Sequence, residues 1–258
     1  MRLVLDMLSR AAAPGPPTVV RFAGSYNATM ATLFVPSVAA ANAIPNGLEL
    51  RNVTGAPDGT HPVIVTFGAQ SNVTAGTPLA VPLNYLESVI GIPGVGVAGD
   101  AQNRSAIFMP RLDVDNPVAA ALGWATGYAK TLSSISAGAG FFAVRTLLAK
   151  AQVLALATQL SSGAGQPTDF PLFRFTADML AQPIISVDAA GNRIFTQFNW
   201  NLGTAVLFGA TAHLQVFAAS LPVLAAGNYD WQSYQNQTVG AGQITSNWDL
   251  TGPYPDWP

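Results

Sequence analysis

The sequence predicts a mostly β fold of the α+β class, built as an antiparallel sheet or barrel with a few short helices. Two observations support this prediction. The 24 glycines and 19 prolines are spread along the chain, and the runs between them are short and rich in β-branched and aromatic residues. Helical candidates are few, and they do not alternate with the strands as βαβ units would.

Six runs are predicted as strands because they combine β-branched and aromatic residues with flanking turn residues. The last run alternates between apolar and polar residues from Arg193 to Trp200. Residues 188–192 lie between two of the runs and predict a hairpin loop. The predicted strands are residues 18–22, 30–35, 62–67, 105–109, 184–187 and 193–200.

Two short segments are predicted to be helical. Residues 36–43 are rich in alanine and end before Pro45. Asn116 followed by Pro117 is typical of a helix start, since asparagine caps free N–H groups and proline is tolerated at the first helical position. Residues 143–160 fit two structures, because their Ala, Leu, Lys and Gln content favours a helix while residues 153–158 could form a strand.

The composition indicates small-molecule binding or self-association. Half of the residues are apolar and 9% are charged, against about 25% in an average protein. A net charge of −2 argues against a nucleic-acid or membrane partner, since both attract basic surfaces. No apolar stretch reaches the roughly 18 residues that cross a bilayer. The absence of cysteine excludes disulfides and thiolate chemistry.

Residues 1–17 end in a proline-rich stretch and lack the apolar core and cleavage site of a secretory signal. We expect them to form an extension, followed by one domain over residues 18–258, and we expect a cytoplasmic location. Five Asn-x-Ser/Thr triplets keep a secreted location open, because such triplets are glycosylation acceptors in the secretory pathway. The asparagines of these triplets are Asn27, Asn52, Asn72, Asn103 and Asn236.

Two patterns have an ordinary structural explanation. Gly94, Gly96 and Gly99 match the dinucleotide-binding pattern, but no apolar helical stripe follows them, so they predict a glycine-rich loop. His61 and His213 show no metal-ligand spacing, so we expect hydrogen-bonded or exposed histidines and no metal site.

Asp113 and Asp115 place two carboxylates on one side of an extended segment. Aspartate is common in turns and helix caps. We therefore expect this pair in a solvated turn before the helix at Pro117.

Lys130 and Glu87 are the candidate catalytic residues. The chain has two lysines and two glutamates, and Lys130 is the one charged residue between Asp115 and Arg145. Its apolar neighbours fit either a side chain whose head reaches water or a desolvated amine. A neutral amine can attack a ketone to form an imine, and a carboxyl group in an apolar segment can move the protons.

Several segments resemble the acetoacetate decarboxylase family, in the same order along the chain. Tyr85-Leu-Glu87-Ser88 resembles the family's Tyr-x-Glu-Ser segment, and Gly127-Tyr-Ala-Lys130-Thr-Leu132 resembles its lysine motif. Shorter likenesses extend the resemblance from about Arg21 to Tyr254. These are Asp115-Asn-Pro117, the pair Phe173-Arg-Phe175 and Ile184-Ile-Ser-Val-Asp188 (which resembles a strand pair), Leu221-Pro222-Val223 and Asp249-Leu-Thr-Gly-Pro-Tyr254.

This resemblance implies a double-cone, mostly antiparallel β-barrel and a homo-oligomer. It implies that Lys130 is the Schiff-base nucleophile and that Glu87 lies in the same site. It also favours a hairpin over residues 143–160, with Lys150 at its turn. The candidate substrate-binding residues are Tyr85, Trp124, Tyr128 and Thr131.

The sequence departs from the family at three places. Thr131 stands where the family has a second lysine, Ser25 and Tyr26 where a substrate-side arginine is expected, and residues 66–68 where another glutamate is expected. Two functions therefore remain. One is a lyase that forms a Schiff base with a keto acid or related carbonyl compound, for decarboxylation, aldol or retro-aldol chemistry or dehydration, without metal or organic cofactor. The other is a non-catalytic small-molecule-binding barrel.

Overall fold

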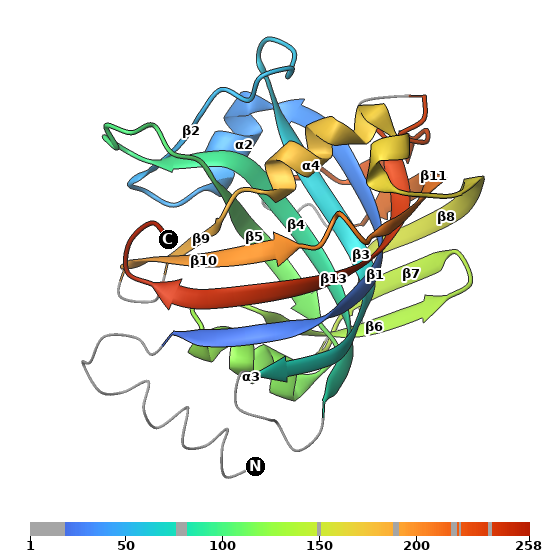
Figure 1. Cartoon of the computed structure of the whole chain (residues 1–258), viewed down its shortest axis with the longest axis horizontal. Helices are drawn as coiled ribbons and strands as arrows, with labels where there is room; N and C mark the ends of the chain where they lie inside the picture. The colour runs from blue at the N-terminus through green and yellow to red at the C-terminus, as the bar shows by residue number, and fades with distance from the viewer. Residues whose placement is uncertain are drawn as a thin grey trace.

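A computed structural model describes residues 19–75, 82–148, 151–187, 191–217, 221, 223–236 and 239–258 (Figure 1). The expected extension at residues 1–17 lies outside the described residues. The described strands are β1 (Val20–Pro36), β2 (Leu48–Leu50), β3 (Thr60–Ala75), β4 (Leu83–Val97), β5 (Ala106–Val114), β6 (Thr131–Gly138), β7 (Phe141–Thr146), β8 (Gln152–Gly165), β9 (Ile184–Val187), β10 (Arg193–Trp200), β11 (Val206–Val216), β12 (Gly227–Trp231) and β13 (Ala241–Tyr254). The described helices are α2 (Ser37–Ala43), α3 (Pro117–Ala125) and α4 (Arg174–Leu180), with short 3-10 helices η1 (Pro167–Asp169) and η2 (Pro171–Phe173).

The described strands form one 13-stranded sheet in the order β12-β11-β8-β7-β6-β5-β9-β10-β13-β1-β3-β4-β2. Two further pairings, β11 with β13 and β5 with β4, close this path into two rings that share β5, β9, β10 and β13. Pairing within the sheet is antiparallel except where β5 meets β6 and β9. In Figure 1, α3 lies at one end of the molecule and α2 and α4 at the other. The predicted mostly β class is confirmed.

Burial along the strands explains why they form here. β11 alternates between buried and exposed residues over much of its length, as a strand with one wet face does. β4 is buried without a break from Glu87 to Gly96, which is typical of a strand covered on both faces. Glu87 is therefore the first residue of a fully buried strand segment, where a carboxylate needs partners.

The predicted elements are largely confirmed. Residues 184–187 and 193–200 coincide with β9 and β10, and the two strands pair antiparallel from Arg193 opposite Val187. Residues 188–190 of the predicted hairpin loop lie outside the described residues. Residues 30–35 lie in β1, which also contains 20–22, while 62–67 lie in β3 and 106–109 in β5. Residues 37–43 form α2. β7 pairs antiparallel with β8, as the resemblance implied for residues 143–160, while residues 149–150, with Lys150, lie outside the described residues.

Two predictions are wrong. Gly94 and Gly96 lie within β4 and not in a loop, whereas Gly99 lies in the turn after β4. A β-carbon at Gly96 would collide with the Arg51 side chain, which would have to move. Phe173 ends η2 and Phe175 lies in α4, so this segment is not a strand, because Pro171 starts a helical turn that α4 continues.

Both histidines are hydrogen-bonded or partly exposed, as expected. His61 is buried, and its Nε2 lies 2.6 Å from the Pro93 carbonyl oxygen. His213 is partly exposed, and its Nδ1 lies 2.7 Å from the Asp230 carboxylate. None of the described helices has the length and apolar character to cross a membrane.

Candidate active site

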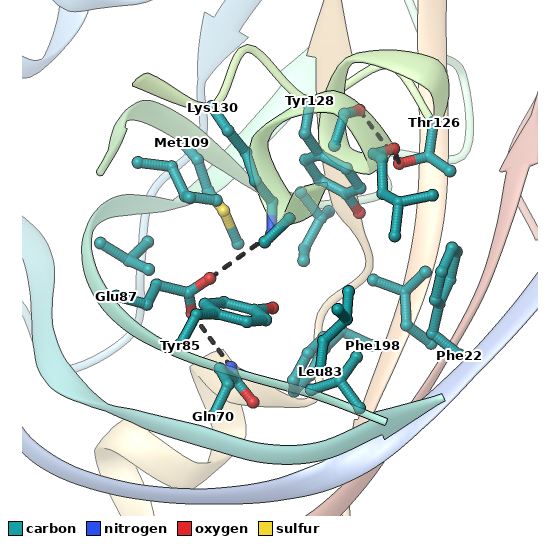
Figure 2. Close-up of a pocket in the computed structure, with 18 of the residues that line it drawn as sticks. Phe22, Gln70, Leu83, Tyr85, Glu87, Met109, Thr126, Tyr128, Lys130 and Phe198 are labelled. Atoms are coloured by element: carbon teal, nitrogen blue, oxygen red, sulfur yellow. Dashed lines mark hydrogen bonds and ion pairs between the residues drawn. The ribbon is translucent and has the colours of Figure 1, made fainter. Parts of the chain in front are cut away.

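Lys130 and Glu87 face each other across one wall of a cavity (Figure 2). Nζ of Lys130 lies 3.6 Å from Oε2 of Glu87, and the two side chains are 13% and 7% exposed. The cavity has a volume of about 90 Å³, several times the roughly 10–15 Å³ that one water needs. It can therefore hold a small organic molecule against the amine.

β4 brings Glu87 to the cavity. Glu87 lies opposite Gly68 of β3 and Val114 of β5, so both neighbouring strands fix its backbone. Gly68 is required here, because a β-carbon would come within 2.6 Å of the Ala28 backbone on the next strand. The carboxylate thus projects from the middle of three packed strands.

Lys130 is placed by the turn that follows α3. The predicted cap is confirmed, since Asn116 Oδ1 accepts from the backbone N–H groups of Val118 at 2.8 Å and Ala119 at 3.2 Å. The helix ends at Ala125 and Thr126 caps it, and Gly127 follows with a φ of 86°, a left-handed conformation that suits glycine. The chain then reverses, and the N–H of Tyr128 donates to the Gly123 carbonyl at 2.8 Å.

Lys130 then precedes β6, whose first residue Thr131 pairs with Asp113 of β5. Because β5 also pairs with β4, this parallel junction brings Lys130 close to Glu87, 43 positions earlier in the sequence. Two residues with few charged neighbours in sequence thereby become an ion pair.

Gln70 is a site residue that the sequence did not reveal. Its Nε2 donates to Oε1 of Glu87 at 3.0 Å, and its Oε1 accepts from the indole N–H of Trp248 at 2.7 Å. The indole can only donate, so it fixes which way the Gln70 amide points. The signal was absent from the local sequence because Trp248 lies 178 positions from Gln70.

Tyr85 and Tyr128 line the same cavity as Lys130 and Glu87. Lys130 Nζ lies 5.2 Å from the centre of the Tyr85 ring, within the range of a cation–π contact. Burial raises the pKa of Tyr85 well above its ordinary value, and the nearby Glu87 charge raises this pKa further. Burial also raises the pKa of Tyr128, whose phenol is hydrogen-bonded to the Thr196 hydroxyl. Both phenols are therefore neutral near pH 7.

The structure does not bring Trp124 and Thr131 to the cavity. Trp124 is 63% exposed, and Thr131 is exposed at the start of β6. The indole N–H of Trp124 instead donates to the Lys130 carbonyl oxygen at 3.0 Å. Trp124 thus holds the backbone of the lysine, and neither residue is placed to contact a ligand in this cavity.

A second cavity of about 70 Å³ adjoins the first and shares Glu87 as a lining residue. Tyr26 lines it, and its buried hydroxyl has no hydrogen-bond partner in the part of the chain that the structure describes. Burial raises the pKa of Tyr26 well above its ordinary value, with the Glu87 charge as the next cause. Thr66 lines the same cavity. Tyr26 and Thr66, two of the positions where the sequence departs from the expected pattern, therefore place neutral groups on the same cavity as Glu87.

The solvated turn expected for Asp113 is wrong. Asp113 is fully buried in β5, where it accepts two hydrogen bonds from Arg111, at 2.7 and 2.8 Å, and one from Ser133 at 2.6 Å. Arg111 is its ion-pair partner there, as a buried carboxylate requires. Asp115 is the more exposed of the pair, and its carboxylate accepts from the Leu86 N–H. Asp113 ties β5 to β6 beside Lys130.

Metal ligands do not gather in the part of the chain that the structure describes. There, no group of three or more His, Asp or Glu side chains could hold a metal ion. The site's charged chemistry rests on Lys130 and Glu87.

No family model matches the chain, and no curated protein sequence matches it. Solved structures do match. An acetoacetate decarboxylase-like enzyme from Sphingomonas wittichii RW1 is 13% identical with a TM-score of 0.60, over 93% of this chain and 92% of that one. The enduracididine biosynthesis enzyme MppR, complexed with the condensation product of pyruvate and imidazole 4-carboxaldehyde, is 16% identical with a TM-score of 0.57, over 94% and 90%. Acetoacetate decarboxylase from Legionella pneumophila is 12% identical with a TM-score of 0.55, over 95% and 92%. The chain therefore has the acetoacetate decarboxylase-like fold.

Proposed function

We propose that this protein is an enzyme, a lyase that forms a Schiff base between Lys130 and a carbonyl compound. The observation that supports this proposal is the pairing of Lys130 with Glu87 at 3.6 Å inside a largely apolar cavity. A structural ion pair would not need an adjoining cavity that can hold a small molecule.

The chemistry follows from the two groups. The neutral amine of Lys130 adds to the carbonyl carbon, and the carbonyl oxygen leaves as water, so that a C=N bond replaces the C=O bond. The resulting iminium draws electrons from a bond at the neighbouring carbon. Glu87 can accept the proton released there and return it when the enamine is reprotonated. Addition of water to the iminium then frees the product and the lysine.

Three reaction classes use this enamine: decarboxylation, aldol or retro-aldol chemistry, and dehydration of a β-hydroxy compound. MppR, which shares the fold, is described in complex with a condensation product of pyruvate and an aldehyde. That complex favours carbon–carbon bond chemistry for this chain as well. Tyr85 and Tyr128 would line the substrate, because both lie on the Lys130 cavity.

Reductive trapping tests the proposal against the non-catalytic binding alternative. The protein would be incubated with pyruvate, acetoacetate, acetone or an aldehyde, reduced with cyanoborohydride, and digested for mass spectrometry. We expect an adduct on Lys130 at a concentration that leaves Lys150, the chain's other lysine, unlabelled. Lys130→Arg is the control, because it keeps a cation beside Glu87 but cannot form an imine. If no carbonyl compound labels Lys130 in preference to Lys150, the lyase proposal fails and the binding alternative is favoured.

A further inference from the structure

The charges around the two cavities set a limit on the substrate. Among the described residues that line either cavity, Lys130 and Glu87 are the charged ones, and they neutralise each other. The other described lining residues are apolar or neutral polar. None of the described arginines lines either cavity, and the nearby Arg111 is already held by Asp113 at 2.7 Å.

A bound carboxylate would add a third, unbalanced charge to this site. When Lys130 forms an imine its positive charge is kept on the iminium, and Glu87 still balances it. A second anion would be buried without a partner, which is strongly disfavoured in an apolar cavity. It could pair with the iminium only by displacing Glu87, the group that would move the proton.

Gln70 opposes such a displacement. Its N–H donates to Oε1 of Glu87 at 3.0 Å, and Trp248 fixes the amide in that orientation at 2.7 Å. The Trp248 indole N–H and one of the two Gln70 amide N–H groups are therefore already used, and the direction of the amide suits an accepting carboxylate oxygen of Glu87.

The second cavity offers a neutral donor instead. The buried hydroxyl of Tyr26 has no hydrogen-bond partner among the described residues, and it lines the cavity on which Glu87 and Thr66 also lie. A neutral phenol can donate to a hydroxyl, ether or carbonyl oxygen of a ligand. An orphaned buried donor of this kind matches an uncharged ligand that brings its own oxygen.

We propose that the substrate is an uncharged ketone or aldehyde with an apolar chain, and not a keto acid. This inference rests on the imine chemistry proposed above. Such a compound would place its carbonyl carbon at Lys130 and its chain along the apolar walls. It would leave the Lys130–Glu87 pair as the balanced charges of the site.

A matched pair of ketones tests the inference. 4-Oxopentanoate and its methyl ester carry the same ketone and differ in charge, and both labelling rates would be normalised to labelling of N-acetyl-lysine in solution. With cyanoborohydride present, we expect the ester to label Lys130 half-maximally at a concentration at least about tenfold lower than the acid, because the acid buries an unpaired anion. Equal labelling, or preference for the acid, would overturn the inference and leave the imine function intact. If neither ketone labels Lys130, the proposed function fails and the inference fails with it.

Two variants sharpen the comparison. Leu83 is half-buried and lines the Lys130 cavity, whereas its neighbour Asn84 is exposed on the other face of β4. Leu83→Arg should raise labelling by the acid about tenfold, because it supplies the missing counter-charge. Asn84→Arg changes the net charge equally but lies outside the cavity, so it should leave the ratio between ester and acid unchanged. If Leu83→Arg folds and the ratio does not move, charge does not set the selectivity of this site.

Discussion

Gly123 lies against the aliphatic stem of Lys130. A β-carbon at position 123 would come within 2.5 Å of Cγ and Cδ of the lysine and 2.8 Å of Cε. Gly123 lies in α3, where glycine costs about 1 kcal/mol relative to alanine. α3 therefore carries a residue that disfavours helix formation at the position where the Lys130 side chain packs against it.

The first prediction concerns this contact. Gly123→Ala should favour α3 itself by about 0.5–1 kcal/mol, yet it should displace Lys130 and lower the rate of Schiff-base labelling at least about tenfold, because small misplacements of reacting groups are costly. The measurement is the rate of reductive labelling of Lys130. Gly163→Ala is the control, since nothing lies within 4 Å of its added β-carbon. If Gly123→Ala leaves the labelling rate unchanged, the position of Lys130 does not depend on its contact with Gly123.

Glu87→Gln separates imine formation from proton transfer. It keeps the shape of the side chain but removes the proton acceptor, so exchange of the α-hydrogens of acetone in deuterated water should slow by roughly 10²–10⁴-fold. NMR measures that exchange, and Lys130 should still be labelled. The control is Glu49→Gln, which changes the chain's other glutamate, a residue 45% exposed beside Arg51. This variant should exchange the α-hydrogens of acetone at the wild-type rate. If Glu87→Gln exchanges these hydrogens at the wild-type rate, Glu87 does not transfer the proton.

Gln70 is predicted to stabilise the site as well as position it. Gln70→Leu would leave the Trp248 indole N–H and one oxygen of Glu87 without partners, and each buried unsatisfied group costs about 1–3 kcal/mol. We expect the free energy of unfolding in urea to fall by about 2 kcal/mol or more. Gln159→Leu, on an exposed position of β8, should change it by less than about 0.5 kcal/mol. If the free energy of unfolding falls by a similar amount in the two variants, the hydrogen bonds of Gln70 to Trp248 and Glu87 do not stabilise the fold.

The strands and the central pair could be predicted because their signals are local. The alternation from Arg193 to Trp200 gave β10 with its bounds, and the isolation of Lys130 and Glu87 among apolar residues marked them as unusual. Residues 143–160 needed the resemblance, because their helical propensity opposes the hairpin that pairing with neighbouring strands imposes.

The rest of the site depends on contacts that no local pattern encodes. The orientation of the Gln70 amide is set by a hydrogen bond from Trp248, which lies 178 positions later in the chain. The signal for Asp113 was present but overlooked, since Arg111 two residues earlier shares its strand face and forms its ion pair. Trp124 looked like a pocket residue because aromatic residues often are, but it lies on α3 with its side chain exposed.

Tyr26 gives a prediction about ligand selectivity. 4-Hydroxy-4-methylpentan-2-one carries a second oxygen that pentan-2-one lacks, and the free Tyr26 hydroxyl is the donor placed to meet it. Tyr26→Phe should reduce the preference for the hydroxyketone, measured as the ratio of the two half-maximal labelling concentrations, by about tenfold, because one hydrogen bond in a buried site is lost. If this ratio is the same in Tyr26→Phe and the wild type, Tyr26 does not donate to the second oxygen of the ligand.

His61 predicts how stability depends on pH. Burial lowers its pKa from the ordinary value of 6.5, and the hydrogen bond to the Pro93 carbonyl opposes this only in part. The unfolded chain therefore binds a proton near pH 6.5 that the folded chain accepts only at lower pH, so the free energy of unfolding decreases as the pH falls below about 7. Urea unfolding at a series of pH values between about 7.5 and 5.5 measures the decrease. His61→Gln keeps a donor for Pro93 without a titrating ring and should flatten this dependence, whereas His213→Gln, at a partly exposed histidine, should retain it. If the two variants show the same pH dependence, His61 is not the group responsible.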